Sequence, residues 1–269
     1  MLDDVLYNIF VIIFVIFIVI ILSVGVFLLL RGLQIKMNNI IIASVGFISL
    51  PIGVIGYFVF NFSGLFQEVF VYISFIMTVL FTNKTFYKRR KHGFRHLANW
   101  IQLITIILGF IQILLLSIAM VFGINVYYLR VSLDFPYTFI VFNWLAWSAF
   151  KSYKNLKEYD IEPWVKLRYK LIAFFSFIIS FNNLPEFFQP KGVHWGDSEN
   201  IISLILFGVT VILCVIFAMG FLIAWIMPNC FKKKINKNYK PAQDKEYSEE
   251  ELMKLIKEQL DQKSFSDSQ

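Results

Sequence analysis

From Val5 to Leu30 the chain carries no charged side chain, and most residues are Ile, Val, Leu or Phe. An α-helix needs about 20 apolar residues to cross the hydrocarbon core of a bilayer. The run follows the acidic start Asp3-Asp4, whereas a secretory signal has a basic start and a shorter apolar region. The segment is therefore predicted to be a retained membrane-spanning helix.

Six further segments are candidates for membrane spans on the same length rule. Together the seven predicted spans are 5–30, 39–61, 65–83, 97–123, 136–150, 167–183 and 201–227. Segment 136–150 is the shortest, and the pattern leaves open whether it crosses fully, is tilted or is partly inset. Residues 1–228 are expected to form the membrane domain and residues 229–269 a short tail.

The composition excludes a soluble globule. Hydrophobic residues make up 58% of the chain, charged residues 16%, and the mean hydropathy is +0.68. A soluble domain has about 45–50% apolar and about 25% charged residues, because a folded chain must cover itself with polar groups. The expected fold class is an all-α integral membrane protein.

The cations are distributed unevenly along the chain. If the loops alternate between two sides, Arg130 and Lys191 are the only ones of the 25 Lys and Arg residues on one side. Cytoplasmic loops carry the excess of Lys and Arg. This pattern predicts seven crossings of the cell membrane, with the N-terminus outside and the C-terminus in the cytoplasm.

Two clusters of basic residues flank predicted spans. They are expected to contact anionic lipid headgroups rather than nucleic acid. Their members are Lys88, Arg89, Arg90, Lys91, Arg95, Lys232, Lys233 and Lys234. Further along the tail, Ser248 and Glu251 form a capping box, and an amphipathic helix over 249–262 is expected to offer a docking surface for a cytosolic partner.

No acidic or basic side chain is expected deep within a span. Such residues usually mark proton relays and ion sites, so their absence argues against a proton pump or voltage sensor. The layout resembles that of rhodopsins and heptahelical receptors in span count and orientation only, since 201–227 has no Lys for a retinal Schiff base. No catalytic set, metal site or cofactor is predicted, and the chain is not expected to be an enzyme.

Uncharged polar residues follow one face of two predicted spans. In 97–123 they recur every three or four residues, as neighbours on a helix do, and in 167–183 the spacing is similar. They are Asn99, Gln102, Thr105, Gln112, Ser176, Ser180 and Asn183. Such a stripe either packs helices together or lines a ligand pocket. Gln102 and Gln112 are the strongest candidates, because an amide in lipid needs a partner.

These features favour a heptahelical sensor or receptor-like signalling protein. One alternative is a transporter that passes a small neutral solute along the polar stripes. Another is a structural or accessory subunit, in which the stripes only hold helices together. An intramembrane enzyme fits least well.

Overall fold

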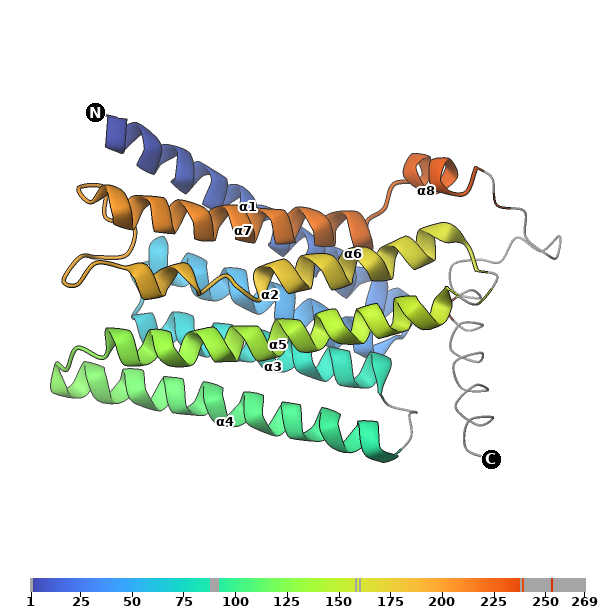
Figure 1. Ribbon diagram of the computed structural model, residues 1–269, viewed down its shortest axis with the longest axis horizontal. Coiled ribbons are helices and arrows are strands. Elements are labelled where there is room, and N and C mark those ends of the chain that lie inside the picture. Colours follow the sequence, from blue (N-terminus) through green and yellow to red (C-terminus); the bar gives the residue numbers. More distant parts are fainter. Residues whose placement is uncertain are drawn as a thin grey trace.

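The computed structural model describes residues 2–87, 92–157, 161–237 and the single residues 159, 239 and 253. Within that part of the chain the secondary structure is helical throughout (Figure 1). The helices are α1 (Leu2–Gln34), α2 (Asn38–Phe58), α3 (Gly64–Phe86), α4 (His92–Phe122), α5 (Tyr127–Leu156), α6 (Pro163–Ile179), η1 (Pro185–Phe188), α7 (Ile201–Trp225) and α8 (Asn229–Ile235).

Five of these helices are long and apolar enough to cross a membrane: α1, α2, α3, α4 and α7. The protein is therefore a multi-pass membrane protein by length and composition. The other two long helices do not meet the same criterion. Helix α6 has 17 residues, and α5 has a lower hydrophobicity because charged residues occur near both of its ends.

The helix that contains the predicted fifth span starts before Pro136. Helix α5 has 30 residues and begins at Tyr127, so Pro136 lies inside it. The helix continues through the charged residues before the proline, where Arg130 and Asp134 form an i,i+4 ion pair on one face. Segment 136–150 is therefore the central part of a longer helix.

Helix α6 starts and ends about one turn before the predicted span 167–183. Pro163 occupies its first turn, where the missing N–H costs nothing and the fixed φ suits a helix. The C-terminal part of the predicted span, up to Asn183, is a turn that leads into η1.

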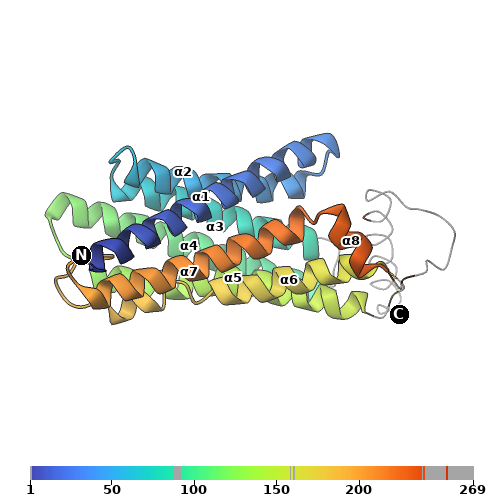
Figure 2. The same ribbon diagram turned by 90° about the horizontal axis from the view of Figure 1, so that it is seen from above.

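Six helices form a ring in the order α1, α2, α3, α5, α6, α7 and back to α1. Helix α4 lies outside this ring and, among the described helices, contacts only α3 and α5. It runs along the lower edge of the bundle in Figure 1 and lies behind the other helices in Figure 2. Its other flank carries exposed apolar side chains such as Leu103, Ile107 and Phe110. Gln102 and Gln112 on the polar stripe of α4 therefore contact residues of α3 and α5.

Long helices that follow one another in the sequence run antiparallel, so the bundle has two distinct ends (Figure 1). We call the end where α1, α3, α5 and α7 begin the cavity end, and the opposite end the basic end. Apart from Arg130 and Lys191, the described Lys and Arg residues lie toward the basic end. Helix α8, which carries Lys232, Lys233 and Lys234, packs there against α6.

Parts of the predicted basic and tail segments cannot be compared with the structure. Lys88, Arg89, Arg90 and Lys91 lie outside the described residues, while Arg95 is exposed in the first turn of α4. Of the predicted helix 249–262, only Met253 belongs to the described part.

Glycines bring α2 and α3 into the most extensive contact between two helices of the bundle. A Cβ atom at Gly53 would lie 2.7 Å from Phe70 Cβ and 3.0 Å from the Gln67 carbonyl oxygen. Small residues allow this close approach of two backbones in a membrane. The contact fixes the wall of α3 that carries Gln67 and Glu68.

Candidate ligand-binding cavity

The ring of helices encloses a cavity of about 760 Å³. Its wall is formed by α1, α2, α3, α5 and α7, the last residue of α6, and the loop between α6 and α7. Pockets for small organic molecules measure about 300–1,000 Å³ and are mostly apolar with a few polar groups. The volume therefore suits a ligand of drug-like size.

Aromatic side chains form a large part of the wall. The phenylalanines come from five helices: Phe14 and Phe17, Phe47 and Phe58, Phe75 and Phe81, Phe142, and Phe207, Phe217 and Phe221. Several of these rings contact each other, for example Phe217 and Phe221 with centroids 4.4 Å apart. Such a surface binds an apolar body by area burial and ring contacts.

The cavity opens at the end of the bundle where α1, α3, α5 and α7 begin. Its lining there includes Asn125, Gly192 and His194, which are exposed. In the opposite direction it reaches Phe81 and Phe221, which are 6% and 1% exposed. The cavity is thus open at one end and bounded by packed rings at the other.

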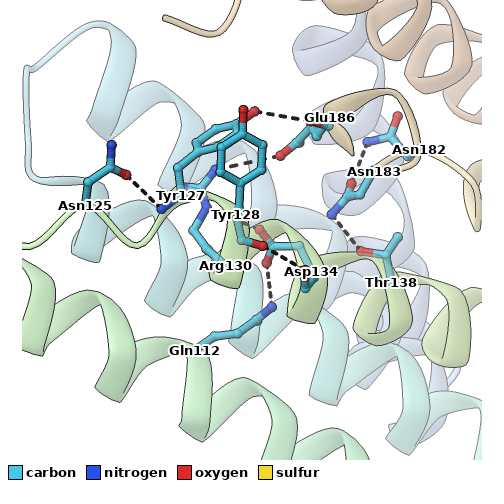
Figure 3. Close-up of polar contacts among 11 residues, drawn as sticks. Gln112, Asn125, Tyr127, Tyr128, Arg130, Asp134, Thr138, Asn182, Asn183 and Glu186 are labelled. Carbon is cyan, nitrogen blue, oxygen red and sulfur yellow. Dashed lines mark hydrogen bonds and ion pairs between the residues drawn. The ribbon is translucent and has the colours of Figure 1, made fainter. Parts of the chain in front are cut away.

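A cluster of charged side chains lies at the open end, with Arg130 of α5 in the middle (Figure 3). Arg130 Nε is 3.3 Å from Asp134 Oδ2, and its Nη2 atom is 3.8 Å from Glu186 Oε2 on η1. The second oxygen of Asp134 accepts a hydrogen bond of 2.5 Å from the Gln112 amide on α4. Three segments that are far apart in the sequence therefore meet at one cation.

Glu68 is the third carboxylate that lines the cavity. It is half-buried on α3, within electrostatic reach of Arg130, Asp134 and Glu186. Among the described residues its side chain has neither an ion pair nor a hydrogen bond. Three carboxylates therefore share one guanidinium, and Glu68 is the one without a direct partner.

Glu186 lies in η1, outside the long helices. Burial, with a further contribution from the negative charge of Asp134, raises the pKa of Glu186 to about 7, although Arg130 opposes the shift. Burial disfavours a charged carboxylate, and a nearby like charge adds to that effect. The charge of the cluster therefore changes near neutral pH.

The rim of the cavity is held by a polar network in the loop between α6 and α7. Gln189 donates to the carbonyls of Val193 and His194, each at 3.0 Å, and to Ser203 Oγ at 2.9 Å. Ser203 Oγ also accepts from the Gly196 backbone at 3.0 Å. These bonds order the loop above the entrance and connect it to the first turn of α7.

The residues of the predicted polar stripes occupy different surroundings. Asn183 lines the cavity and donates to Thr138 Oγ1 at 3.1 Å. Asn99 is exposed, and Thr105 is buried in α4 with its hydroxyl bonded to the Ile101 carbonyl. Ser176 is buried without a hydrogen-bond partner among the described residues, and Ser180 accepts from Asn143 at 3.1 Å.

Each of the two glutamines on α4 has a hydrogen-bond partner. Gln102 accepts from Asn83 at 3.3 Å, and Asn83 in turn accepts from the Trp144 indole at 2.8 Å. Gln112 binds Asp134 instead. Gln102 therefore lies in close packing among α3, α4 and α5. Gln112 instead donates a hydrogen bond from α4 to Asp134, a residue of the cavity wall.

The bundle beyond the cavity is closely packed. Trp144 stacks on Tyr87 with centroids 4.7 Å apart, and Phe81 contacts Trp225 edge-on at 6.0 Å. The buried Arg168 donates to the Ala224 carbonyl at 3.0 Å, and its guanidinium lies 4.7 Å from the Trp164 ring centroid. These contacts close the ring between the cavity and the basic end.

None of the four charged residues of the site was among the predicted site residues: Glu68, Arg130, Asp134 and Glu186. The spacing of Arg130 and Asp134 is a signal that could have been used, because i,i+4 partners of opposite charge indicate a helix face. Nothing in the sequence places Glu68 and Glu186 beside them, since those contacts depend on how the helices pack.

The described residues contain no group of three or more His, Cys, Asp or Glu side chains able to hold a metal ion. Comparisons with protein-family models, curated proteins and solved structures give no match. The site is therefore interpreted from its geometry alone.

Proposed function

We propose that the protein is a heptahelical receptor that binds a small organic ligand in this cavity. The observation that carries the proposal is the cavity of about 760 Å³, which is open at one end of the bundle and bounded by packed rings at the other. A binding site needs one entrance, whereas a transport pathway must open alternately on both sides.

The proposal includes seven membrane crossings with the cavity end outside the cell. Helices α5 and α6 run beside α3 and α7 in the ring, so a bilayer that covers those helices also covers α5 and α6 (Figure 1). The cations gather at the opposite end, which the positive-inside rule assigns to the cytoplasm. Arg130 and Lys191 are then the exceptions on the outer face.

Helix α4 is the element through which a bound ligand would act. At the cavity end it holds Asp134 through Gln112, and toward the basic end it contacts Asn83 through Gln102. A ligand that changes the charge or position of Asp134 alters one of these two connections. Such a ligand shifts the balance between two packings of α4, and the basic loops and tail carry the change to a cytosolic partner.

Directional access to the cavity tests the proposal. Thr78 lines the cavity and Thr105 does not, yet each donates its hydroxyl to the carbonyl four residues earlier in its own helix. We would prepare Thr78→Cys and Thr105→Cys in a background with Cys214→Ala and Cys230→Ser. Membrane-impermeant thiol reagents would then be applied to intact cells and to inverted vesicles.

The receptor proposal predicts that Thr78→Cys is modified from outside only and that Thr105→Cys is modified from neither side. Modification of Thr78→Cys from both sides would instead indicate a transporter. Modification from the cytoplasmic side alone would overturn the orientation. If Thr78→Cys reacts from neither side, the cavity has no entrance, and a structural subunit becomes the better proposal.

A further inference from the structure

We propose that the ligand of the cavity is an organic cation with an apolar body, bound with its ammonium group between Glu68 and Glu186 and its body among the phenylalanines. The inference rests on the proposed receptor function and names the chemical class of its ligand. It is drawn from two independent features, the excess of carboxylates at the entrance and the aromatic wall below it.

The described residues at the entrance carry more carboxylates than cations. Glu68, Asp134 and Glu186 line the cavity together with one guanidinium among these residues, that of Arg130. His194 also lines it, but at the exposed rim. Removing a charge from water is costly unless an opposite charge is close by. A cation supplied from solution would balance the excess.

The positions of the carboxylates leave room for that cation. Asp134 is already bound by both Arg130 and Gln112. Glu186 reaches Arg130 only at 3.8 Å, and Glu68 has no direct partner among the described residues. Glu68 and Glu186 therefore hold unused hydrogen-bond acceptors, and they belong to two different elements, α3 and η1.

The size and lining of the cavity exclude a bare metal ion as the natural ligand. The space is far larger than an ion needs, and the described residues provide no cluster of three metal ligands. Phenylalanine rings instead favour an apolar body, and their faces attract ammonium groups. A molecule with one protonated amine and a phenylalkyl body matches both parts of the site.

The test compares three probes of nearly equal size: 4-phenylbutylamine, 4-phenylbutanol and 4-phenylbutyrate. Binding to the full chain in phosphatidylcholine nanodiscs is measured by calorimetry at pH 8, with empty nanodiscs subtracted. The same titrations are run on Glu68→Gln and on Glu199→Gln, a matched control whose carboxylate is exposed at the same end and does not line the cavity.

We expect the amine to bind at least about tenfold more tightly than the alcohol, and the butyrate to bind most weakly, because complementary charge decides between ligands of equal shape. Glu68→Gln should remove most of the preference for the amine, while Glu199→Gln should keep it. Retained binding of the alcohol by Glu68→Gln would show that this variant still folds.

Equal binding of amine and alcohol would overturn the cationic class but leave the receptor proposal standing, as would an unchanged preference in Glu68→Gln. Absence of binding by all three probes would also overturn the inference. The receptor proposal itself is tested separately, by the direction from which Thr78→Cys is modified.

Discussion

The polar side chains at the two ends of the bundle differ in whether they have partners within the protein. Toward the basic end, Asn83 connects Gln102 and Trp144, and each of these groups has a partner within the protein. At the cavity end, Glu68 has no direct partner in the part of the chain that the structure describes, and Glu186 is only loosely paired with Arg130. The first arrangement stabilises the fold, and the second leaves groups available to a ligand.

This difference predicts which substitutions should lower stability and which should change ligand binding or pH dependence. Replacing a residue of the packed region should lower stability with little specific effect on binding. Replacing a charged residue of the entrance should change binding or pH dependence more than stability. The predictions below challenge this division in order of decreasing expected effect.

The largest loss of stability is expected for Trp144→Ala. Trp144 is 6% exposed, stacks on Tyr87 and donates to Asn83. Removing a buried Trp side chain costs about 3–5 kcal/mol. Thermal unfolding in detergent micelles would measure it, with Trp147→Ala as the control, because Trp147 lies on the same helix and is 59% exposed. Equal losses for the two variants would contradict the packing described here.

The two glutamines of α4 give the next contrast. Gln112→Leu should cost about 2 kcal/mol, because it leaves the Asp134 carboxylate without its amide donor and bonds to charged groups are the stronger ones. Gln102→Leu should cost only about 0.6 kcal/mol, the typical value for a hydrogen bond between membrane helices. Titration with a denaturing detergent would measure both, and a larger loss for Gln102→Leu would reverse the comparison.

Arg130→Gln removes the cation shared by the carboxylates of the entrance. The guanidinium side chain is 35% exposed, so the pair is partly screened and the loss should be about 1 kcal/mol at pH 8. The loss should shrink at pH 5, where carboxylates become protonated and need no counter-charge. Lys191→Gln, which removes an exposed cation at the same end, is the control and should have no effect at either pH.

The smallest difference between successive measurements is expected in the dependence of stability on pH. The folded-state pKa of Glu186, about 7, lies above its ordinary value of 4.5. Arg130, Asp134 and Tyr127 of α5 face this group, and Glu68 of α3 lies near it. Between pH 4.5 and 7 the folded protein therefore keeps a proton on Glu186 that the unfolded chain has already released.

The contribution of Glu186 to stability is complete below pH 4.5 and is lost as the pH rises through 7. Glu186→Gln should flatten the stability curve in this window, while Glu199→Gln should leave it unchanged. Unfolding measured at half-unit steps from pH 4.5 to 8.5 provides the comparison. An unchanged slope in Glu186→Gln would mean that another group dominates this pH range.

The sequence predicted the helical architecture well where a single physical rule decides it. Long uncharged runs such as 5–30 and 201–227 are helices in the structure, because in lipid every backbone group must bond within its own segment. The full length of α5 did not follow from this rule, because Arg130 and Asp134 precede the apolar segment 136–150. A charged pair that neutralises itself on one helix face does not interrupt the helix.

The candidate site was much less predictable. The stripe on α4 indicated that Gln112 needs a partner, but only the packing of α4 against α5 makes that partner Asp134. Glu68 and Glu186 are 118 residues apart in the printed sequence, and no local pattern brings them together. Of the seven stripe residues predicted on 97–123 and 167–183, Asn183 alone lines the cavity.

The ordered rim also determines how quickly the site can be occupied. Gln189 and Ser203 already hold the loop above the entrance, so a ligand does not have to wait for that segment to fold. Capture should then be limited by diffusional encounter, and the surplus negative charge should accelerate the arrival of cations. We expect an association rate that falls as salt is added, and a residence time that depends instead on the phenylalanine walls.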